Sequence, residues 1–152
     1  MIPVIRADQS KCFETVPKVM VNGDVIFTIS DGPIQINELM SECISLNDDT
    51  ASTMQYKSNP TLATAATISG ASASLADFAL GGTVKLAPTA LTTAPILALV
   101  GAGGIHLGVD EGNRIVVQKG TLSLVIGVGS TTGTWKHYIR YTPLSPNAVI
   151  LG

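Results

Sequence analysis

The sequence is short of charged side chains, aromatic side chains and long apolar runs. Charged residues make up 13% and aromatic residues 5% of its 152 residues, whereas a soluble domain carries roughly 25% charged residues. This is too few charged residues for the fully exposed surface of a monomer. We therefore expect a surface rich in Ser, Thr, Asn and Gly, part of which another subunit covers.

The charges that are present form no stripe of one sign. The net charge is −2, and acidic and basic residues alternate along the chain. Because a phosphate backbone attracts clustered Lys and Arg side chains, the sequence argues against nucleic acid as a direct partner.

No apolar run is long enough to cross a membrane as a helix. The most apolar stretch, residues 94–105, contains Pro95 and the cluster Gly101-Ala102-Gly103-Gly104, and a spanning helix needs about 18 apolar residues. Residues 1–8 lack the basic and apolar regions of a secretory signal. We expect synthesis in a cytoplasm and no membrane partner.

Cysteine and histidine are too sparse for a metal or disulfide framework. Cys12 and Cys43 lie far apart without a CxxC or Cys/His pattern, which favours two reduced, partly buried thiols. Neither His106 nor His137 has a metal ligand at the usual spacing, and His137 is predicted to be a histidine at the edge of the core with a satisfied ring. The sequence predicts no metal and no cofactor.

No catalytic motif is present either. The acidic clusters Asp48-Asp49 and Asp110-Glu111-Gly112-Asn113 lack the calcium-loop pattern and are interpreted as solvated turns. No G-x-S-x-G occurs, and the glycines of residues 101–104 and 127–133 fit neither G-x-G-x-x-G nor the Walker spacing. We predict no catalytic, cofactor-binding or metal residues and no enzyme; the one weak alternative is His106 with Asp110, Glu111 and Arg114.

Short runs bounded by turn residues predict a β protein. The runs, each rich in β-branched or alternating apolar residues, are 24–30, 34–46, 51–57, 83–86, 96–100, 114–118, 122–128 and 134–142. The alternation in the second run blurs near Met40, which suggests a bulge. In residues 61–80, periodicity does not separate a buried strand from a short helix, and 75–80 is the most ambiguous segment.

The C-terminal third has the clearest alternation. Leu122, Leu124, Ile126 and Val128 share one face of their strand, and Trp135, His137, Ile139 and Tyr141 share one face of the next. Since a short loop, residues 129–133, joins the two runs, we predict a hairpin with an aromatic inner surface.

These elements predict an all-β fold. Both a sandwich and a barrel hide strand edges; we expect an antiparallel β-sandwich, jelly-roll-like. Residues 23–152 are predicted to form this single domain. Residues 1–22, with Pro3 and Pro17 and little periodicity, are predicted to form an extended N-terminal arm that orders on a neighbouring subunit.

Two parts of the chain resemble small virion structural proteins of tailed bacteriophages. The first runs from Gly120-Thr121-Leu122-Ser123-Leu124-Val125 to Gly133-Thr134-Trp135-Lys136-His137-Tyr138-Ile139-Arg140-Tyr141-Thr142-Pro143-Leu144. The second is Ile34-Gln35-Ile36-Asn37-Glu38-Leu39 followed by Thr53-Met54-Gln55-Tyr56-Lys57-Ser58-Asn59-Pro60-Thr61. Together they cover about half of the chain, and residues 63–109 contribute nothing to the resemblance.

The resemblance implies a capsid decoration (cement) protein. Such a protein is a β-rich subunit that sits on the capsid exterior as a symmetric oligomer, commonly a trimer, so the implied partners are the major capsid protein and further copies of the chain. Low charge fits this role, because it reduces the desolvation cost of burying surface. The alternatives are a tail, collar or fibre-associated β module of the virion, and a small-ligand-binding barrel or enzyme.

Overall fold

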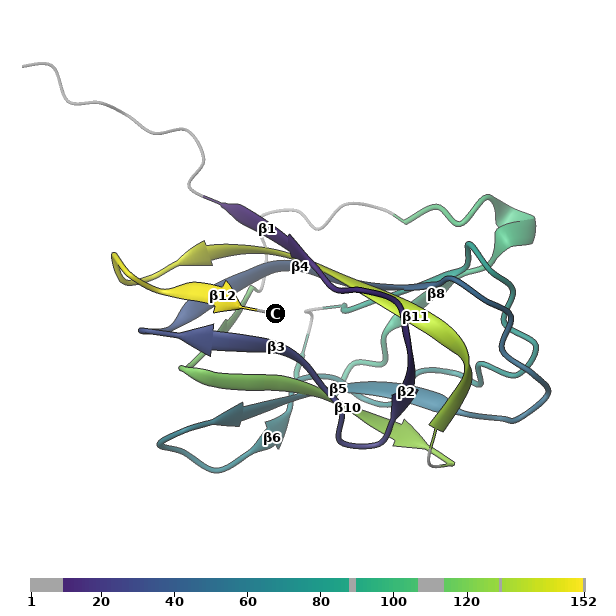
Figure 1. The fold of residues 1–152 in the computed structure, drawn as a ribbon, viewed down its shortest axis with the longest axis horizontal. Coiled ribbons are helices and arrows are strands. Elements are labelled where there is room, and N and C mark those ends of the chain that lie inside the picture. The colour runs from purple at the N-terminus through teal and green to yellow at the C-terminus, as the bar shows by residue number, and fades with distance from the viewer. Residues whose placement is uncertain (1–9, 88–89, 107–113, 129, 152) are drawn as a thin grey trace, which may run out of the picture.

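The structure is a computed structural model, and it describes residues 10–87, 90–106, 114–128 and 130–151. About 51% of the chain is strand and 2% is helical. Two antiparallel sheets pack against each other, with β4 and β11 in one layer and β5 and β10 in the other (Figure 1). The predicted antiparallel β-sandwich is confirmed. In the part of the chain that is described, no helix is long and apolar enough to cross a membrane.

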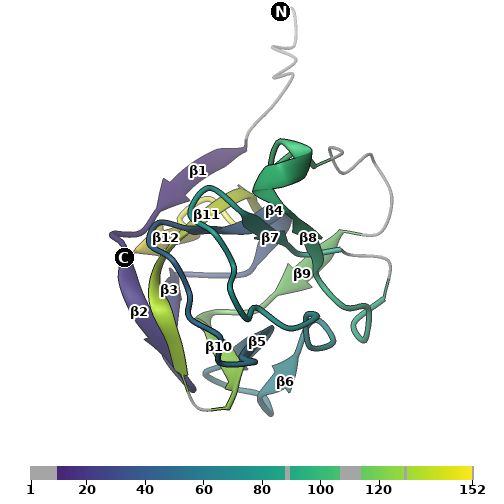
Figure 2. The same ribbon diagram turned by 90° about the vertical axis from the view of Figure 1, so that its right-hand side faces the viewer.

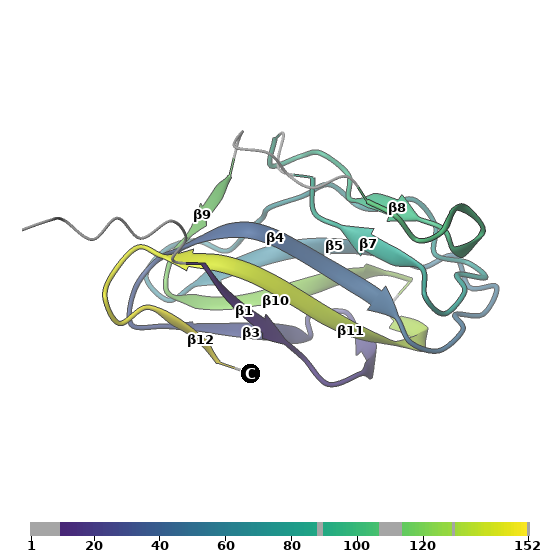
Figure 3. The same cartoon turned by 90° about the horizontal axis from the view of Figure 1, so that it is seen from above.

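The larger sheet, sheet A, has seven strands. They are β1 (Lys11–Glu14), β2 (Lys18–Val21), β4 (Ile34–Cys43), β7 (Thr83–Lys85), β8 (Ile96–Ala98), β9 (Ile115–Val117) and β11 (Ser130–Pro143). Their order is β1-β11-β4-β7-β8, with β2 also paired to β11 and β9 to β4, and Figure 3 shows this sheet from above.

The smaller sheet, sheet B, has five strands in the order β12-β3-β10-β5-β6. They are β3 (Val25–Ser30), β5 (Thr53–Pro60), β6 (Ala66–Thr67), β10 (Gly120–Gly127) and β12 (Val149–Leu151), and a short 3-10 turn, η1 (Val100–Ala102), follows β8 of the other sheet. Successive strands cross between the sheets repeatedly, as expected of a jelly-roll-like sandwich.

The core lies between the two sheets, where the predicted alternation holds. Trp135, His137, Ile139 and Tyr141 of β11 are buried, whereas Lys136, Tyr138 and Arg140 are not. The Trp135 ring stacks on Phe78 at 5.4 Å, which gives the ambiguous segment 75–80 an inward-facing anchor without a helix or strand. Aromatic contacts of this kind add to the stabilisation from burial.

The predicted C-terminal hairpin is wrong. β10 pairs with β3 and β5 in sheet B, whereas β11 pairs with β1, β2 and β4 in sheet A. The chain crosses from one sheet to the other just after Val128, which has a positive φ of 66°. A short glycine-bounded loop can serve a crossing as well as a hairpin, so the loop length alone misled the prediction.

A buried asparagine fixes the chain after this crossing. The Oδ1 atom of Asn47 accepts hydrogen bonds from the backbone N–H groups of Thr132 and Gly133 at 3.0 and 2.8 Å. Its Nδ2 atom donates to Ser52 Oγ and to the carbonyl of Leu75. Because Asn47 follows the end of β4, it ties three connections together at one end of the sandwich.

Much of the predicted arm, residues 1–22, belongs to sheet A in the structure. β1 and β2 both pair with β11, and between them Thr15 exchanges hydrogen bonds with the backbone of His137. Pro17 has no N–H to donate, which explains why one edge strand is interrupted there. Residues 1–9 lie outside the described part of the chain.

The other strands lie close to their predicted positions, with two local differences. The second predicted strand ends at Cys43 rather than Leu46, because Ile44 and Leu46 are exposed where the chain turns toward Asn47. The bulge in β4 lies at Asn37 rather than Met40, since Glu38 pairs with Arg140 while Ile36 pairs with Tyr141.

Candidate functional site

A chain of polar side chains links the two sheets inside the core. Ser41 of β4 lies between His137 of β11 and Tyr56 of β5, with Oγ 2.7 Å from His137 Nδ1 and 2.8 Å from Tyr56 Oη. The other ring nitrogen of His137 lies 3.3 Å from the sulfur of Met20. Each of these four side chains is at most 1% exposed.

The partners assign the hydrogens in this chain of contacts. A thioether sulfur only accepts hydrogen bonds, so His137 Nε2 carries the proton and donates to Met20. His137 Nδ1 then accepts from the Ser41 hydroxyl, which in turn accepts from the hydroxyl of Tyr56 at 2.8 Å; the carbonyl of Val84, 3.3 Å from the same hydroxyl, is the longer and competing acceptor. Burial, with a smaller contribution from Lys18, lowers the pKa of His137 to about 3, against a weak opposing effect of Asp24. The ring is therefore neutral at ordinary pH.

The Ser41–His137 pair has nucleophile and base within reach, but the geometry favours a structural role. Hydrolytic triads orient the histidine with a carboxylate and expose the serine to substrate. Here a methionine occupies the second nitrogen of His137, and Ser41 is 0% exposed. Sequence reasoning missed the cluster because its four members lie on four different strands; the inward position of Tyr56 was the available signal.

The alternative site suggested by the sequence is not assembled among the described residues. His106 Nε2 lies 2.6 Å from Thr83 Oγ1, and burial together with the charge of Lys85 lowers the pKa of His106. Arg114 instead donates to Asn37 Oδ1 at 3.0 Å. Asp110 and Glu111 lie outside the described residues. The ranges that the structure describes hold no group of three His, Cys, Asp or Glu side chains able to bind a metal.

The first acidic cluster is a turn, as predicted. Asp48 Oδ1 accepts a hydrogen bond from the backbone N–H of Thr50 at 2.8 Å, and this bond lowers the pKa of Asp48. The second acidic cluster, Asp110-Glu111-Gly112-Asn113, lies outside the described residues. Cys12 is exposed and Cys43 is buried, and both are free thiols.

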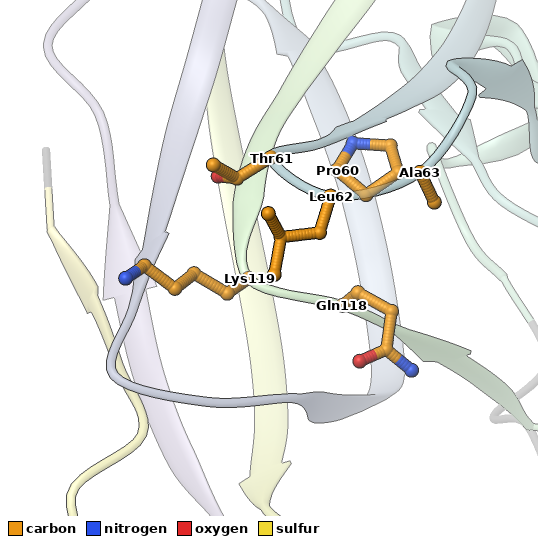
Figure 4. Close-up of a pocket in the computed structure, with 6 residues that line it drawn as sticks. All are labelled: Pro60, Thr61, Leu62, Ala63, Gln118 and Lys119. Atoms are coloured by element: carbon orange, nitrogen blue, oxygen red, sulfur yellow. The ribbon is translucent and has the colours of Figure 1, made fainter.

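Three hollows in the described part of the surface are large enough to receive side chains, and one of them, of about 380 Å³, lies beside Met40, Tyr138 and Arg140 of sheet A. The remaining two lie elsewhere. One, of about 380 Å³, lies where β5 ends and β10 begins, between residues 60–63 and residues 118–119 (Figure 4). Leu62, which borders it, is 96% exposed. The other, of about 320 Å³, lies between the sheets at one side of the sandwich, and Phe13, Val16, Met20, Val25, Ile26 and His137 contribute to its walls.

The outer face of sheet A carries several charged side chains. Alternation along the paired strands places Glu14, Glu38, Glu42, Lys136 and Arg140 on this face. The register puts Lys85 on the same side, but Lys85 is only 5% exposed. Lys136 lies 3.3 Å from Glu14, and Arg140 lies 3.3 Å from Glu38. Tyr138 donates to Glu42 at 2.7 Å, and burial, this hydrogen bond and the neighbouring carboxylates raise the pKa of Tyr138 to about 12.

The outer face of sheet B is almost uncharged. Lys57 is the one charged residue in its five strands, all of which are described. The register places the following outward-facing residues beside it: Val25, Thr28, Ser30, Thr53, Gln55, Asn59, Thr67, Thr121, Ser123, Val125, Val149 and Leu151. Asn59 Nδ2 donates to Ser123 Oγ at 2.8 Å, so neutral hydrogen bonds hold this surface.

The outer face of sheet B can be desolvated at a low cost in free energy. Removing a charge from water costs far more free energy than removing a hydroxyl or an aliphatic side chain, and interface cores are depleted of charged residues. Val25 and Leu151, at the margin of the face, are 52% and 49% exposed. The outer face of sheet B is therefore the best candidate for the functional surface.

Comparison of the chain with protein-family models, with curated proteins and with solved structures finds no match in any of the three.

Proposed function

We propose that this protein is a non-enzymatic virion structural protein that binds the outer capsid surface of a tailed bacteriophage and stabilises the head as a decoration protein. The observation that carries the proposal is the nearly uncharged outer face of sheet B, which holds Lys57 as its one charged strand residue. In this proposal the major capsid protein covers that face, and copies of the chain associate, as a trimer, beside one another.

Two further features support the proposal. Large aliphatic side chains remain exposed at both ends of sheet B, with Leu62 at 96% beyond the end of β5 and Val128 at 71% beyond the end of β10, and such side chains are typical of surfaces that a partner covers. The segment that resembles phage virion proteins also contains β11, the strand that pairs with β1, β2 and β4. Resemblance and surface chemistry thus point to the same role.

Binding to purified virus parts tests the proposal. Heads that lack their decoration protein, and separately purified tails, are mixed with the protein and sedimented, and the bound protein is quantified. We expect saturable binding to heads at symmetric sites, and heads that withstand a higher temperature once coated, because a ligand that binds the assembled state stabilises it. Binding to tails alone would instead favour a tail, collar or fibre role.

A further inference from the structure

One corner of sheet A carries several exposed aliphatic side chains. It lies where β4 and β8 end and β7 begins, because β4 and β8 both run antiparallel to β7. Figure 2 looks onto this end of the sandwich and shows η1 beside β4, β7 and β8. Leu80, Leu99 and Ile105 are 63%, 56% and 76% exposed, and Ile44 and Val100 are 37% and 43% exposed. We call these five side chains the apolar corner.

Close backbone contacts join the three segments that carry the apolar corner. Cys43 exchanges backbone hydrogen bonds with Gly81 and Gly82 at 2.8 and 2.9 Å, which places Ile44 beside Gly81. The third segment lies against the second, because a Cβ atom added to Gly81 would come within 3.2 Å of Val100 Cγ1. The five side chains therefore belong to one continuous part of the surface.

The apolar corner is built from segments without charge. Residues 43–47, 79–82 and 94–105 contain no Asp, Glu, Lys, Arg or His. Burying a charge costs far more free energy than burying an aliphatic side chain, and two copies of an uncharged surface do not repel each other. The apolar corner can therefore be buried against a copy of itself at little electrostatic cost.

The apolar surface is about as large as one side of a stable interface. Leu46 and Ile96, which are 59% and 55% exposed, extend the apolar corner along the chain. The seven side chains present on the order of 700 Å² of surface, which is close to the ~800 Å² that each partner buries in a standard interface. The largest apolar patch on a typical monomer covers roughly 300–600 Å², so this surface is larger than one expected to stay in water.

We propose that the apolar corner packs against the apolar corners of further copies of this chain. The inference deepens the proposed function and rests on it for the number of copies: in a trimer, the corners of three copies meet around the three-fold axis. The strands that frame the corner all belong to sheet A. A capsid that covers the outer face of sheet B therefore leaves the corner free for neighbouring copies.

Single charges placed in the apolar corner test the proposal. Leu80→Asp and Ile105→Asp each put a carboxylate where the copies meet, and the carboxylates of neighbouring copies repel one another. Light scattering over a range of protein concentrations measures the mass. We expect a wild-type trimer, and a concentration of half-dissociation that is at least 10-fold higher in each variant. Leu62→Asp, a matched change at a 96% exposed leucine beyond the end of β5, should keep the wild-type mass at every concentration.

Circular dichroism verifies that each variant keeps its β structure before its mass is interpreted, and Ile105→Asp, at the more exposed position, decides the test if Leu80→Asp is unfolded. A wild type that is monomeric at all concentrations would overturn the inference. Corner variants that keep the wild-type mass, or an equal loss of mass in Leu62→Asp, would also overturn it.

Two further outcomes separate this inference from the proposed function. A wild-type dimer that both corner variants dissociate would support the apolar corner as the contact between copies and reject the trimer. Failure to bind heads, while the corner variants dissociate the oligomer as expected, would reject the proposed function alone.

Discussion

The two outer faces of the sandwich differ in charge. Sheet A presents Glu14, Glu38, Lys136 and Arg140 as two ion pairs, whereas sheet B presents a lattice of Thr, Ser, Asn and Val around Lys57. Both faces cover the same core, so packing does not require the difference. The strands of sheet A place five exposed or half-buried charged side chains on their outer face and those of sheet B place one, so the sheet B face is the easier of the two to desolvate.

The largest expected loss of unfolding free energy comes from breaking the hydrogen bonds of Ser41, which connect sheet A to sheet B in the core. Ser41→Ala removes the hydroxyl between His137 and Tyr56 and leaves His137 Nδ1 buried without a partner, which should cost about 2 to 3 kcal/mol of unfolding free energy. Urea unfolding measures this value. Ser30→Ala, at the surface, serves as the control and should change stability by about 0.5 kcal/mol or less. Two separate transitions in the wild type would break the comparison, because the sheets would then be independent.

Acid should act on the interior rather than on either face. The pKa of His137 is lowered to about 3 in the folded protein, whereas an unfolded histidine titrates near 6.5. Below that pH the unfolded state binds a proton that the folded state does not, so stability falls by about 1.4 kcal/mol per pH unit from roughly pH 6 downward.

Urea unfolding at a series of pH values measures this slope. The stability is fully retained above pH 6.5 and falls as the pH is lowered toward the folded pKa of about 3. His137→Gln should flatten it, and His106→Gln should flatten it less, because His106 is exposed more than His137. Equal slopes in wild type and His137→Gln would assign the acid sensitivity to the surface carboxylates instead.

The hydrogen bonds on the outer face of sheet B should resist salt. Asn59→Ala removes bonds to Ser123 and Thr121 at 2.8 and 3.3 Å, and we expect a loss of about 1 kcal/mol. The same loss at low ionic strength and in 1 M salt would show that neutral contacts hold this face. A loss that shrinks with salt would contradict it.

The smallest effect is expected on sheet A. Glu38→Gln removes an ion pair with Arg140 whose side chains are 37% and 33% exposed, and partly exposed pairs contribute about 0.5 kcal/mol or less. This effect should disappear in 1 M salt, because ions screen exposed charges. A larger loss of unfolding free energy in Glu38→Gln than in Asn59→Ala would contradict the expectation that the hydrogen bonds of sheet B contribute more to stability than the ion pairs of sheet A.

The sequence predicted the fold class because the alternation of apolar and polar residues in β5, β10 and β11 is regular. It could not predict which strands pair: the loop between β10 and β11 fits a hairpin and a crossing equally well, and only the partners of each strand distinguish them. The division of charge between the two faces was also hidden, since each strand alternates in the same way and the sheet to which it belongs decides which face a charge joins.

The polar link in the core was predicted in part. The inward position of His137 followed from its place between Trp135 and Ile139, but its partner Ser41 lies 96 residues away on a strand whose bulge at Asn37 shifts the alternation. A reading of β4 without the bulge places Ser41 on the outer face. One misplaced residue in a strand therefore conceals a buried contact.

The most direct test of the functional surface adds one charge to each outer face. Val125 of sheet B and Met40 of sheet A both face outward and are both half-buried, so Val125→Glu and Met40→Glu form a matched pair. The account predicts that Val125→Glu weakens binding to undecorated phage heads at least 10-fold, while Met40→Glu changes it less than twofold. Equal binding by both variants, or a loss confined to Met40→Glu, would contradict it.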